Sequence, residues 1–173
     1  MGGILQYLSI MPRTPFNVLF VCLGNICRSP AGENIFRHQV KQAGLEDVIN
    51  IDSAGTHDYH PGKAPDKRMC RTLRNRDIPA TGAARQFTAH DYLKFDLILT
   101  MDEDNYARVI ALAGSPEFEQ KVKRFTQFCE GPDHQTLEVP DPYYGDGSGF
   151  ELVADMLKDG CQQVLEFVKK QIP

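Results

Sequence analysis

The segment Cys22-Leu23-Gly24-Asn25-Ile26-Cys27-Arg28-Ser29 places a thiol, a guanidinium and a hydroxyl within eight residues. An apolar run precedes Cys22, and Ser29-Pro30 predicts a helix start, with Ser29 as the N-cap residue and Pro30 as the first helical residue. A strand, a glycine-containing loop and a helix in this order direct several backbone N–H groups at one anion. Arg28 adds a planar fork of donors that can bind two phosphoryl oxygens. The segment therefore predicts an oxyanion site.

Cys22 is the candidate nucleophile of this site. A thiol beside a cation at a helix N-terminus titrates with a pKa of roughly 3.5–7.5 instead of about 8.5. Such a group is a thiolate at neutral pH and attacks an electrophile without a histidine base. The alternative is that Cys22 is a small apolar residue that ends a buried strand, a frequent setting for a lone cysteine. The neighbouring Arg28 and Ser29 favour the nucleophile.

A second candidate for chemistry is Asp141, which opens the run Asp141-Pro142-Tyr143-Tyr144-Gly145. Cleavage of a phosphate ester needs a proton on the leaving oxygen, and a carboxylic acid on a mobile Pro- and Gly-rich loop can supply it. The alternative is a plain turn, because Asp-Pro is a frequent turn opener. The presence of the Cys22–Arg28 loop favours the acid.

Strands and helices that alternate along the chain must position these residues. The strands are predicted from apolar and β-branched runs at Phe16–Val21, Val48–Ser53, Phe95–Met101 and Lys121–Phe125. Helices are predicted from apolar spacing and capping signals at 29–43 with Gly44 as its stop, Pro65–Arg76 with Cys70 and Leu73 facing inward, a short segment capped by Thr88 and Asp91, Asp102–Ala113, and Gly149–Ile172.

This alternation predicts an α/β fold with an open, mainly four-stranded parallel sheet and helices on both faces, a three-layer αβα arrangement. Ligands of such sheets bind beyond the carboxyl ends of the strands, so the active-site loop is expected after the first strand. The chain has 173 residues, 42% of them hydrophobic, which fits one domain. Residues 1–15 are predicted to be an N-terminal extension outside the core, and 16–173 the single domain that carries the site.

Charge and cysteine usage narrow the function classes. The net charge of −4 argues against a nucleic-acid partner. No apolar run approaches the roughly 18 residues of a membrane span, so no membrane insertion and a cytoplasmic location are expected. The five cysteines are odd in number and widely spaced, which predicts reduced thiols. The sequence has no cysteine or histidine spacing typical of a zinc finger, so no metal is expected. The five histidines are assigned no role. The basic residues Lys67, Arg71 and Arg74 are interpreted as a solvated helix face.

The segment Val18–Ser29 resembles the phosphate-binding loop of low-molecular-weight protein tyrosine phosphatases. The similarity covers most of the chain after about Pro15. It includes the runs Asp52-Ser53-Ala54-Gly55, Ala84-Arg85-Gln86, Phe95-Asp96, Met101-Asp102 and Asp141-Pro142-Tyr143-Tyr144-Gly145. The resemblance implies hydrolysis of aryl phosphates and of phosphotyrosine in a protein substrate, through a phosphocysteine intermediate and without a metal or cofactor.

The same resemblance implies a role for each matching residue. Cys22 attacks phosphorus while Asp141 protonates the tyrosyl oxygen. Asp141 then activates the water that hydrolyses the phosphocysteine, and Ser29 hydrogen-bonds the departing thiolate. Arg28 and the phosphate-binding loop hold the phosphoryl group, the loop consisting of Leu23, Gly24, Asn25, Ile26 and Cys27.

Further positions concern the support and the walls of the cleft. In the family, the residue matching Asn25 braces the loop through serines matching Ser29 and Ser53 and through a histidine. Gly82 stands at the position of that histidine, and this departure predicts weaker bracing of the loop. The cleft walls, expected to be too deep for phosphoserine, are assigned to Tyr59, Tyr143 and Tyr144, with ordinary packing as the alternative for Tyr59. Cys27 is interpreted either as the partner of Cys22 in a protective disulfide or as a packed thiol.

Two other functions remain open from the sequence. Arsenate reduction uses a similar cysteine loop but needs further cysteines that relay a disulfide to Cys22, and Cys70, Cys129 and Cys161 are not clustered. A non-catalytic phosphotyrosine-binding module would tolerate the loss of Cys22 or Asp141, yet both are present. A nucleotide-binding P-loop is excluded, because no Gly-x4-Gly-Lys-Ser/Thr run occurs.

Overall fold

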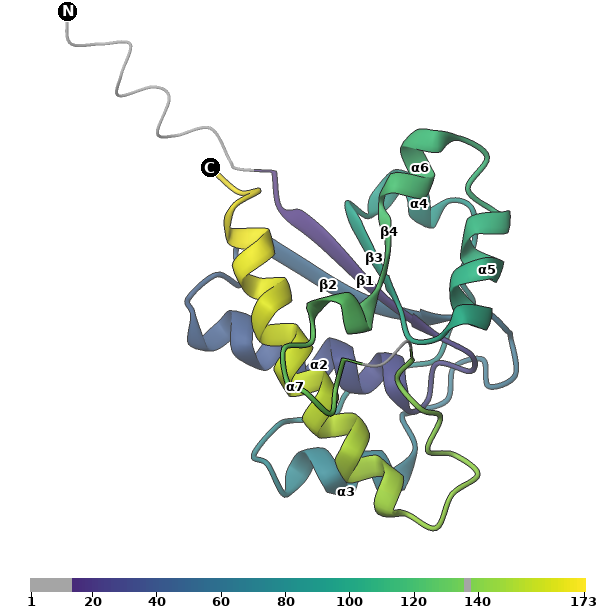
Figure 1. Ribbon diagram of the computed structural model, residues 1–173, viewed down its shortest axis with the longest axis vertical. Coiled ribbons are helices and arrows are strands. Elements are labelled where there is room, and N and C mark those ends of the chain that lie inside the picture. The colour runs from purple at the N-terminus through teal and green to yellow at the C-terminus, as the bar shows by residue number, and fades with distance from the viewer. Residues whose placement is uncertain (1–13, 136–137) are drawn as a thin grey trace, which may run out of the picture.

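The computed structural model describes residues 14–135 and 138–173, with its elements labelled in Figure 1. Most of the predicted N-terminal extension, residues 1–13, lies outside the described residues. The strands are β1 (Phe16–Cys22), β2 (Ile49–Gly55), β3 (Leu97–Thr100) and β4 (Val122–Arg124). They form one sheet in the order β2-β1-β3-β4, in which every neighbouring pair is parallel. The predicted four-stranded parallel sheet is confirmed.

β1 lies inside the sheet because its side chains are apolar on both faces: Val18 to Val21 are fully buried. Phe20 belongs to the apolar cluster beneath α2 (Arg28–Gln42), α3 (Lys67–Arg74) and α7 (Ser148–Lys169). Leu19 and Val21 point to the other face and pack with α4 (Asp91–Lys94), α5 (Glu103–Ala111) and α6 (Pro116–Gln120). Helices therefore cover both faces of the sheet, as predicted (Figure 1).

Local capping signals set most helix boundaries. Gly44, with φ = 68°, follows the end of α2, as the sequence predicted. The Asp66 carboxylate caps α3 by accepting from the Arg68 N–H, and Asp102 caps α5 in the same way. The short α6, which begins after Ser115-Pro116, and the 3₁₀ helix η1 (Phe125–Phe128) were not predicted.

Three local predictions need correction. Ser29 does not cap α2, because the helix already begins at Arg28 with Cys27 as its N-cap residue. Cys70 is only half-buried; the inward face of α3 consists of Met69, Thr72 and Leu73, since residues three and four apart share a face. Of the capping pair expected at α4, only the bond from the Thr88 N–H to the Asp91 carboxylate forms, at 2.8 Å.

The strands end where the candidate site begins. Cys22, the last residue of β1, pairs with Gly55, the last residue of β2. α7 runs back along the sheet, so its C-terminal end lies at the same end of the molecule as the start of β1 (Figure 1). Among the helices of residues 14–135 and 138–173, none combines the length and apolar character that a membrane span requires.

Candidate active site

The loop between β1 and α2 curves around a cleft at the carboxyl end of the sheet. Asn25, near its centre, has φ = 57°, a left-handed backbone that Asn adopts more readily than most residues. No side chain in the described part of the chain caps α2 at Cys27. The N–H groups at this helix start are therefore left for a ligand, and the helix dipole favours an anion there.

The cleft is small, with a volume of about 40 Å³. It is lined by Cys22, Leu23, Gly24, Ile26, Cys27, Arg28, Tyr59, His60, Asp141, Tyr143 and Tyr144. The structure thus brings the predicted nucleophile, cation, acid and three tyrosines into one cleft. The side chains of the other predicted residues, Asn25, Ser29 and Ser53, are buried and do not line the cleft wall.

Arg28 is a buried cation beside Cys22, with only 3% of its side chain exposed. Its guanidinium donates to the Asp102 carboxylate at 2.6 Å and to the Val139 carbonyl at 3.1 Å. A longer contact of 3.4 Å joins it to the Asp141 carboxylate. Burial by itself lowers the pKa of Arg28, but the charges of Cys22 and Asp102 outweigh it and raise that pKa above its ordinary value. A permanent positive charge therefore stands in the cleft.

Two residues of the site received no role from the sequence. Asp102 accepts from Arg28 at 2.6 Å and from the Asn105 N–H at 2.8 Å, so one carboxylate both caps α5 and orients the guanidinium. Its position two residues after β3, the strand next to β1, is the signal that could have found it. His60 lines the cleft wall, with its ring 6.4 Å from the ring of Tyr143.

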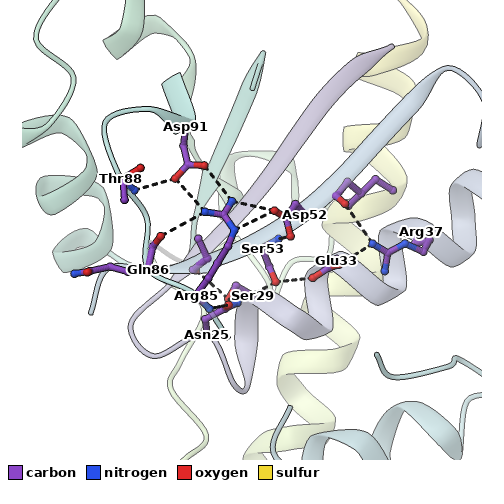
Figure 2. Close-up of polar contacts among 12 residues, drawn as sticks. Asn25, Ser29, Glu33, Arg37, Asp52, Ser53, Arg85, Gln86, Thr88 and Asp91 are labelled. Carbon is purple, nitrogen blue, oxygen red and sulfur yellow. Dashed lines mark hydrogen bonds and ion pairs between the residues drawn. The ribbon is translucent and has the colours of Figure 1, made fainter. Parts of the chain in front are cut away.

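A chain of hydrogen bonds supports the loop from behind. The Cys22 Sγ lies 3.0 Å from the Ser29 Oγ. The Asn25 Nδ2 donates to the Ser29 Oγ at 2.8 Å and to the Ser53 Oγ at 2.9 Å, and the Asn25 Oδ1 accepts from the Arg85 N–H at 3.0 Å (Figure 2). Asn25, Ser29 and Ser53 are at most 5% exposed. Every hydrogen-bonding group of the Asn25 side chain is thus engaged and shielded from water.

The weaker bracing that Gly82 predicted is not found. Instead of a histidine, the Glu33 carboxylate lies next to Ser53 and accepts its hydroxyl at 2.5 Å. Gly82 has φ = 130°, a backbone conformation that glycine adopts freely and a histidine does not. The position is therefore built for glycine, and a different side chain holds Ser53.

The cleft walls are aromatic and partly exposed. The Tyr59 ring, in a residue that is 60% exposed, stacks on His57 at 4.7 Å between ring centroids. The Tyr143 ring lies 4.9 Å from that of Tyr144, and the Arg68 guanidinium lies 5.4 Å from the Tyr143 centroid. All three predicted tyrosines therefore border the cleft, above the buried cysteine loop.

The five cysteines carry free thiols. Burial and the nearby Asp66 carboxylate raise the pKa of Cys27, so its thiol stays protonated at neutral pH. Cys129 and Cys161, the second of them on α7, are buried in one apolar cluster and do not border the cleft. Among the described residues, no group of three or more His, Cys, Asp or Glu side chains is placed to hold a metal ion.

Comparison with known proteins adds an independent finding. The sequence model of the family described as low molecular weight phosphotyrosine protein phosphatase matches residues 17–173. The chain belongs to this family. It is 48% identical over 155 residues to a Synechocystis sp. protein that is named for the same family, covering 90% of this chain and 98% of that protein.

Solved structures agree with this membership. A protein tyrosine phosphatase from Entamoeba histolytica superposes with a TM-score of 0.85 at 36% identity, covering 90% of this chain and 98% of that one. A Drosophila arginine phosphatase superposes with a TM-score of 0.79 at 29% identity, covering 88% and 97% of the two chains. As a member of the low molecular weight family, the chain is a protein-tyrosine-phosphatase, and the predicted fold and function are confirmed.

Proposed function

We propose that this phosphatase transfers the phosphoryl group of a tyrosine phosphate to Cys22 and then to water. In the first step the Cys22 sulfur forms an S–P bond while the bond from phosphorus to the tyrosyl oxygen breaks. The backbone N–H groups of the loop and the Arg28 guanidinium bind the phosphoryl oxygens. What supports these roles is the position of Cys22, Arg28 and Asp141 in one cleft, with Arg28 held by Asp102 at 2.6 Å.

Asp141 is assigned to proton transfer in both steps. Its side chain is 31% exposed, lines the cleft and lies 3.4 Å from Arg28, within reach of a leaving tyrosyl oxygen whose phosphate Arg28 binds. It gives its proton to that oxygen as the P–O bond breaks. In the second step it takes a proton from the water that attacks phosphorus, and the S–P bond breaks.

Ser29 is assigned to the departing sulfur. Its Oγ lies 3.0 Å from the Cys22 Sγ, so its hydroxyl can donate to the thiolate as the S–P bond breaks. The charge that develops on sulfur is then stabilised by a donor that needs no rearrangement. The two leaving atoms thus have separate donors, Asp141 for the tyrosyl oxygen and Ser29 for the sulfur.

The aromatic walls favour a phosphorylated tyrosine in a protein substrate. A tyrosine ring extends between Tyr59 and Tyr143 while its phosphate reaches the loop; a phosphoserine side chain is shorter by that ring. We place the reaction in the cytoplasm, where thiols such as the five free cysteines remain reduced.

One assay tests the substrate class. Peptides that carry phosphotyrosine, phosphoserine or phosphoarginine are compared at equal concentration, in the presence of a metal chelator. Turnover of phosphotyrosine with little turnover of the other two is expected. Preference for phosphoarginine would instead align the chain with the arginine phosphatase that shares its fold, and dependence on a metal would remove the proposed mechanism.

Arsenate reduction is the second function to test, because it also uses a cysteine at the start of such a loop. Cys22 and Cys27 border the cleft, whereas Cys129 and Cys161 are buried in the apolar cluster to which α7 contributes. A relay of disulfides from those two to Cys22 therefore has no path through the cleft. Thiol-dependent arsenate turnover at a rate above that of tyrosine phosphate would contradict this assignment.

A further inference from the structure

Glu33 is a buried carboxylate one helical turn beyond Ser29 on α2 and outside the cleft. It is 6% exposed. Its Oε2 accepts from the Ser53 hydroxyl at 2.5 Å, and its Oε1 accepts from Arg37 Nη2 at 2.6 Å (Figure 2). A buried carboxylate needs partners for its charge, and these two supply them. Ser53 in turn is hydrogen-bonded to Asn25, so Glu33 stands at one end of the chain that supports the phosphate-binding loop.

Glu33 fixes the direction of its own hydrogen bond with Ser53, and the Asn25 amide, which only donates, fixes the next two. An ionised carboxylate only accepts, so Ser53 must donate its single hydroxyl hydrogen to Glu33. The Ser53 oxygen is then free only to accept, and it accepts from the Asn25 amide at 2.9 Å. The same amide group donates to Ser29 at 2.8 Å, which leaves the Ser29 hydrogen for the Cys22 sulfur at 3.0 Å or the Ala54 carbonyl at 3.3 Å.

Because residue 82 is a glycine, no side chain at this position separates Glu33 from Ser53. A Cβ atom built on Gly82 would lie 3.8 Å from the Glu33 Oε2, so a longer side chain there would extend toward the Glu33–Ser53 pair. Asn34 fixes the neighbouring backbone by accepting from the Thr81 N–H at 3.2 Å. Since Gly82 has no side chain, nothing from this segment comes between Glu33 and Ser53.

We infer that Glu33 is a positioning residue which, through Ser53 and Asn25, orients the Ser29 hydroxyl toward the sulfur of Cys22. Its consequence for catalysis rests on the proposed function, because it concerns the thiolate that leaves when the phosphocysteine is hydrolysed. Its consequence for the sulfur itself does not depend on the substrate. A direct measurement of the reactivity of the Cys22 thiol therefore tests the role of Glu33 separately from the proposed function.

The test replaces Glu33 by Met, which has a similar length and no strong hydrogen-bond acceptor. The rate of Cys22 alkylation by iodoacetamide at pH 6 is expected to fall about tenfold, because a fixed donor to the thiolate is lost. With tyrosine phosphate, the steady-state rate should fall about tenfold while the pre-steady-state burst persists, because hydrolysis of the phosphocysteine slows. Failure of the wild-type chain to hydrolyse tyrosine phosphate would refute the proposed function, and the alkylation rates would still test Glu33.

Two matched variants separate the hydrogen bond from its surroundings. Arg37→Gln removes the ion pair on the other oxygen of Glu33 but keeps the bond to Ser53, so both rates should stay close to wild type. Glu33→Gln keeps one carbonyl oxygen that can accept from Ser53, so it should lose less than Glu33→Met. Thermal unfolding of each variant checks that it is folded.

Unchanged alkylation in folded Glu33→Met would overturn the inference. So would an equal loss in Arg37→Gln or in Glu33→Gln, because the effect would then come from charge and not from the hydrogen bond. If Glu33→Met does not fold, Ser53→Ala interrupts the same link from the other side and should show the same loss of about tenfold. Wild-type rates in Ser53→Ala would equally refute the inference.

Discussion

The phosphate-binding loop and the segment 141–145 border the same cleft but are held in different ways. Asn25 ties the loop to α2, to β2 and to the backbone at Arg85. The segment 141–145 has two hydrogen bonds within itself, from the Tyr143 N–H to the Asp141 carboxylate at 3.1 Å and from the Gly145 N–H to the Pro142 carbonyl at 3.2 Å, and the Arg68 guanidinium lies over the Tyr143 ring. Its contact with the loop side of the cleft is the 3.4 Å approach of Asp141 to Arg28.

The two regions also differ in their exposure to solvent. Asn25 of the phosphate-binding loop is 3% exposed, whereas Tyr144 of the segment 141–145 is 84% exposed. Donors that bind an oxyanion act best when they are fixed before the reaction. A proton donor on a rim must let the substrate enter and the product leave. The molecule therefore separates a fixed anion site from an acid on a loosely held segment, and substitutions in the two regions should affect different measurements.

The largest effect is expected from removing the nucleophile. Cys22→Ser should abolish turnover of tyrosine phosphate and leave phosphate affinity largely intact, because the N–H groups and Arg28 remain. Calorimetric titration with phosphate measures the phosphate affinity of the variant. In the wild type, iodoacetate should alkylate Cys22 before the other cysteines, and phosphate should protect it; substantial turnover by Cys22→Ser would rule out the cysteine mechanism.

Asp141→Asn should give the next largest effect, and its size should depend on the leaving group. A positioned acid contributes about 10²–10⁴-fold, and tyrosine needs it because its phenol has a pKa near 10. The burst rate should therefore fall severely for tyrosine phosphate and much less for an activated aryl phosphate. Phosphate affinity should change little. Equal losses for the two esters would mean that Asp141 shapes the segment and does not deliver the proton.

Asn25→Ala tests whether its hydrogen bonds hold the phosphate-binding loop in shape. The substitution leaves the Arg85 N–H without its acceptor and removes the donor to the Ser29 and Ser53 oxygens, and an unsatisfied buried polar group costs about 1–3 kcal/mol. Phosphate affinity should fall about tenfold and the unfolding temperature should drop. The matched control is Asn50→Ala on β2, an exposed Asn that contacts Asn17 and should change neither value. Unchanged phosphate affinity in Asn25→Ala would show that the loop keeps its shape without the bonds.

Tyr144→Ala should have the smallest effect. The residue is 84% exposed, and substitutions at such positions change free energies by about 0.5 kcal/mol, or roughly twofold in KM. The value of kcat should be unchanged with a phosphotyrosine peptide. A tenfold rise in KM would show that the segment closes onto the substrate and buries Tyr144, which would strengthen the contrast with the loop.

Much of the fold could be predicted because its signals are local. β1 contains the apolar run Val18–Cys22, Gly44 follows the end of α2 and Asp102 caps α5. The prediction of Ser29 as the N-cap residue was wrong. Ser-Pro is a common helix start, but here the Ser29 hydroxyl is hydrogen-bonded to Cys22 and Asn25 and not to the helix backbone. A side chain that capped α2 would have taken the N–H groups that an anion needs.

The nucleophile, cation and loop could be predicted because they are neighbours in the sequence. Ser29 and Ser53 were expected as supports only through the family resemblance, and the supports Asp102 and Glu33 could not be predicted, because these contacts arise when distant segments meet. Arg28 and Asp102 are 74 residues apart and come together only because β1 and β3 are adjacent strands. Glu33 and Ser53 are 20 residues apart and belong to α2 and β2. Whether a carboxylate or a histidine would hold Ser53 depends on the backbone at Gly82, which the sequence does not specify.

The start of β1 and the end of α7 lie at the same end of the molecule, whereas the cleft opens where β1 and β2 finish (Figure 1). A tether attached beyond either of these two elements therefore leaves the cleft facing away from the point of attachment. Immobilised on a bead or a sensor surface in this way, the enzyme should accept even large phosphorylated proteins. The same geometry makes it a suitable fusion partner for directing phosphatase activity to a chosen target.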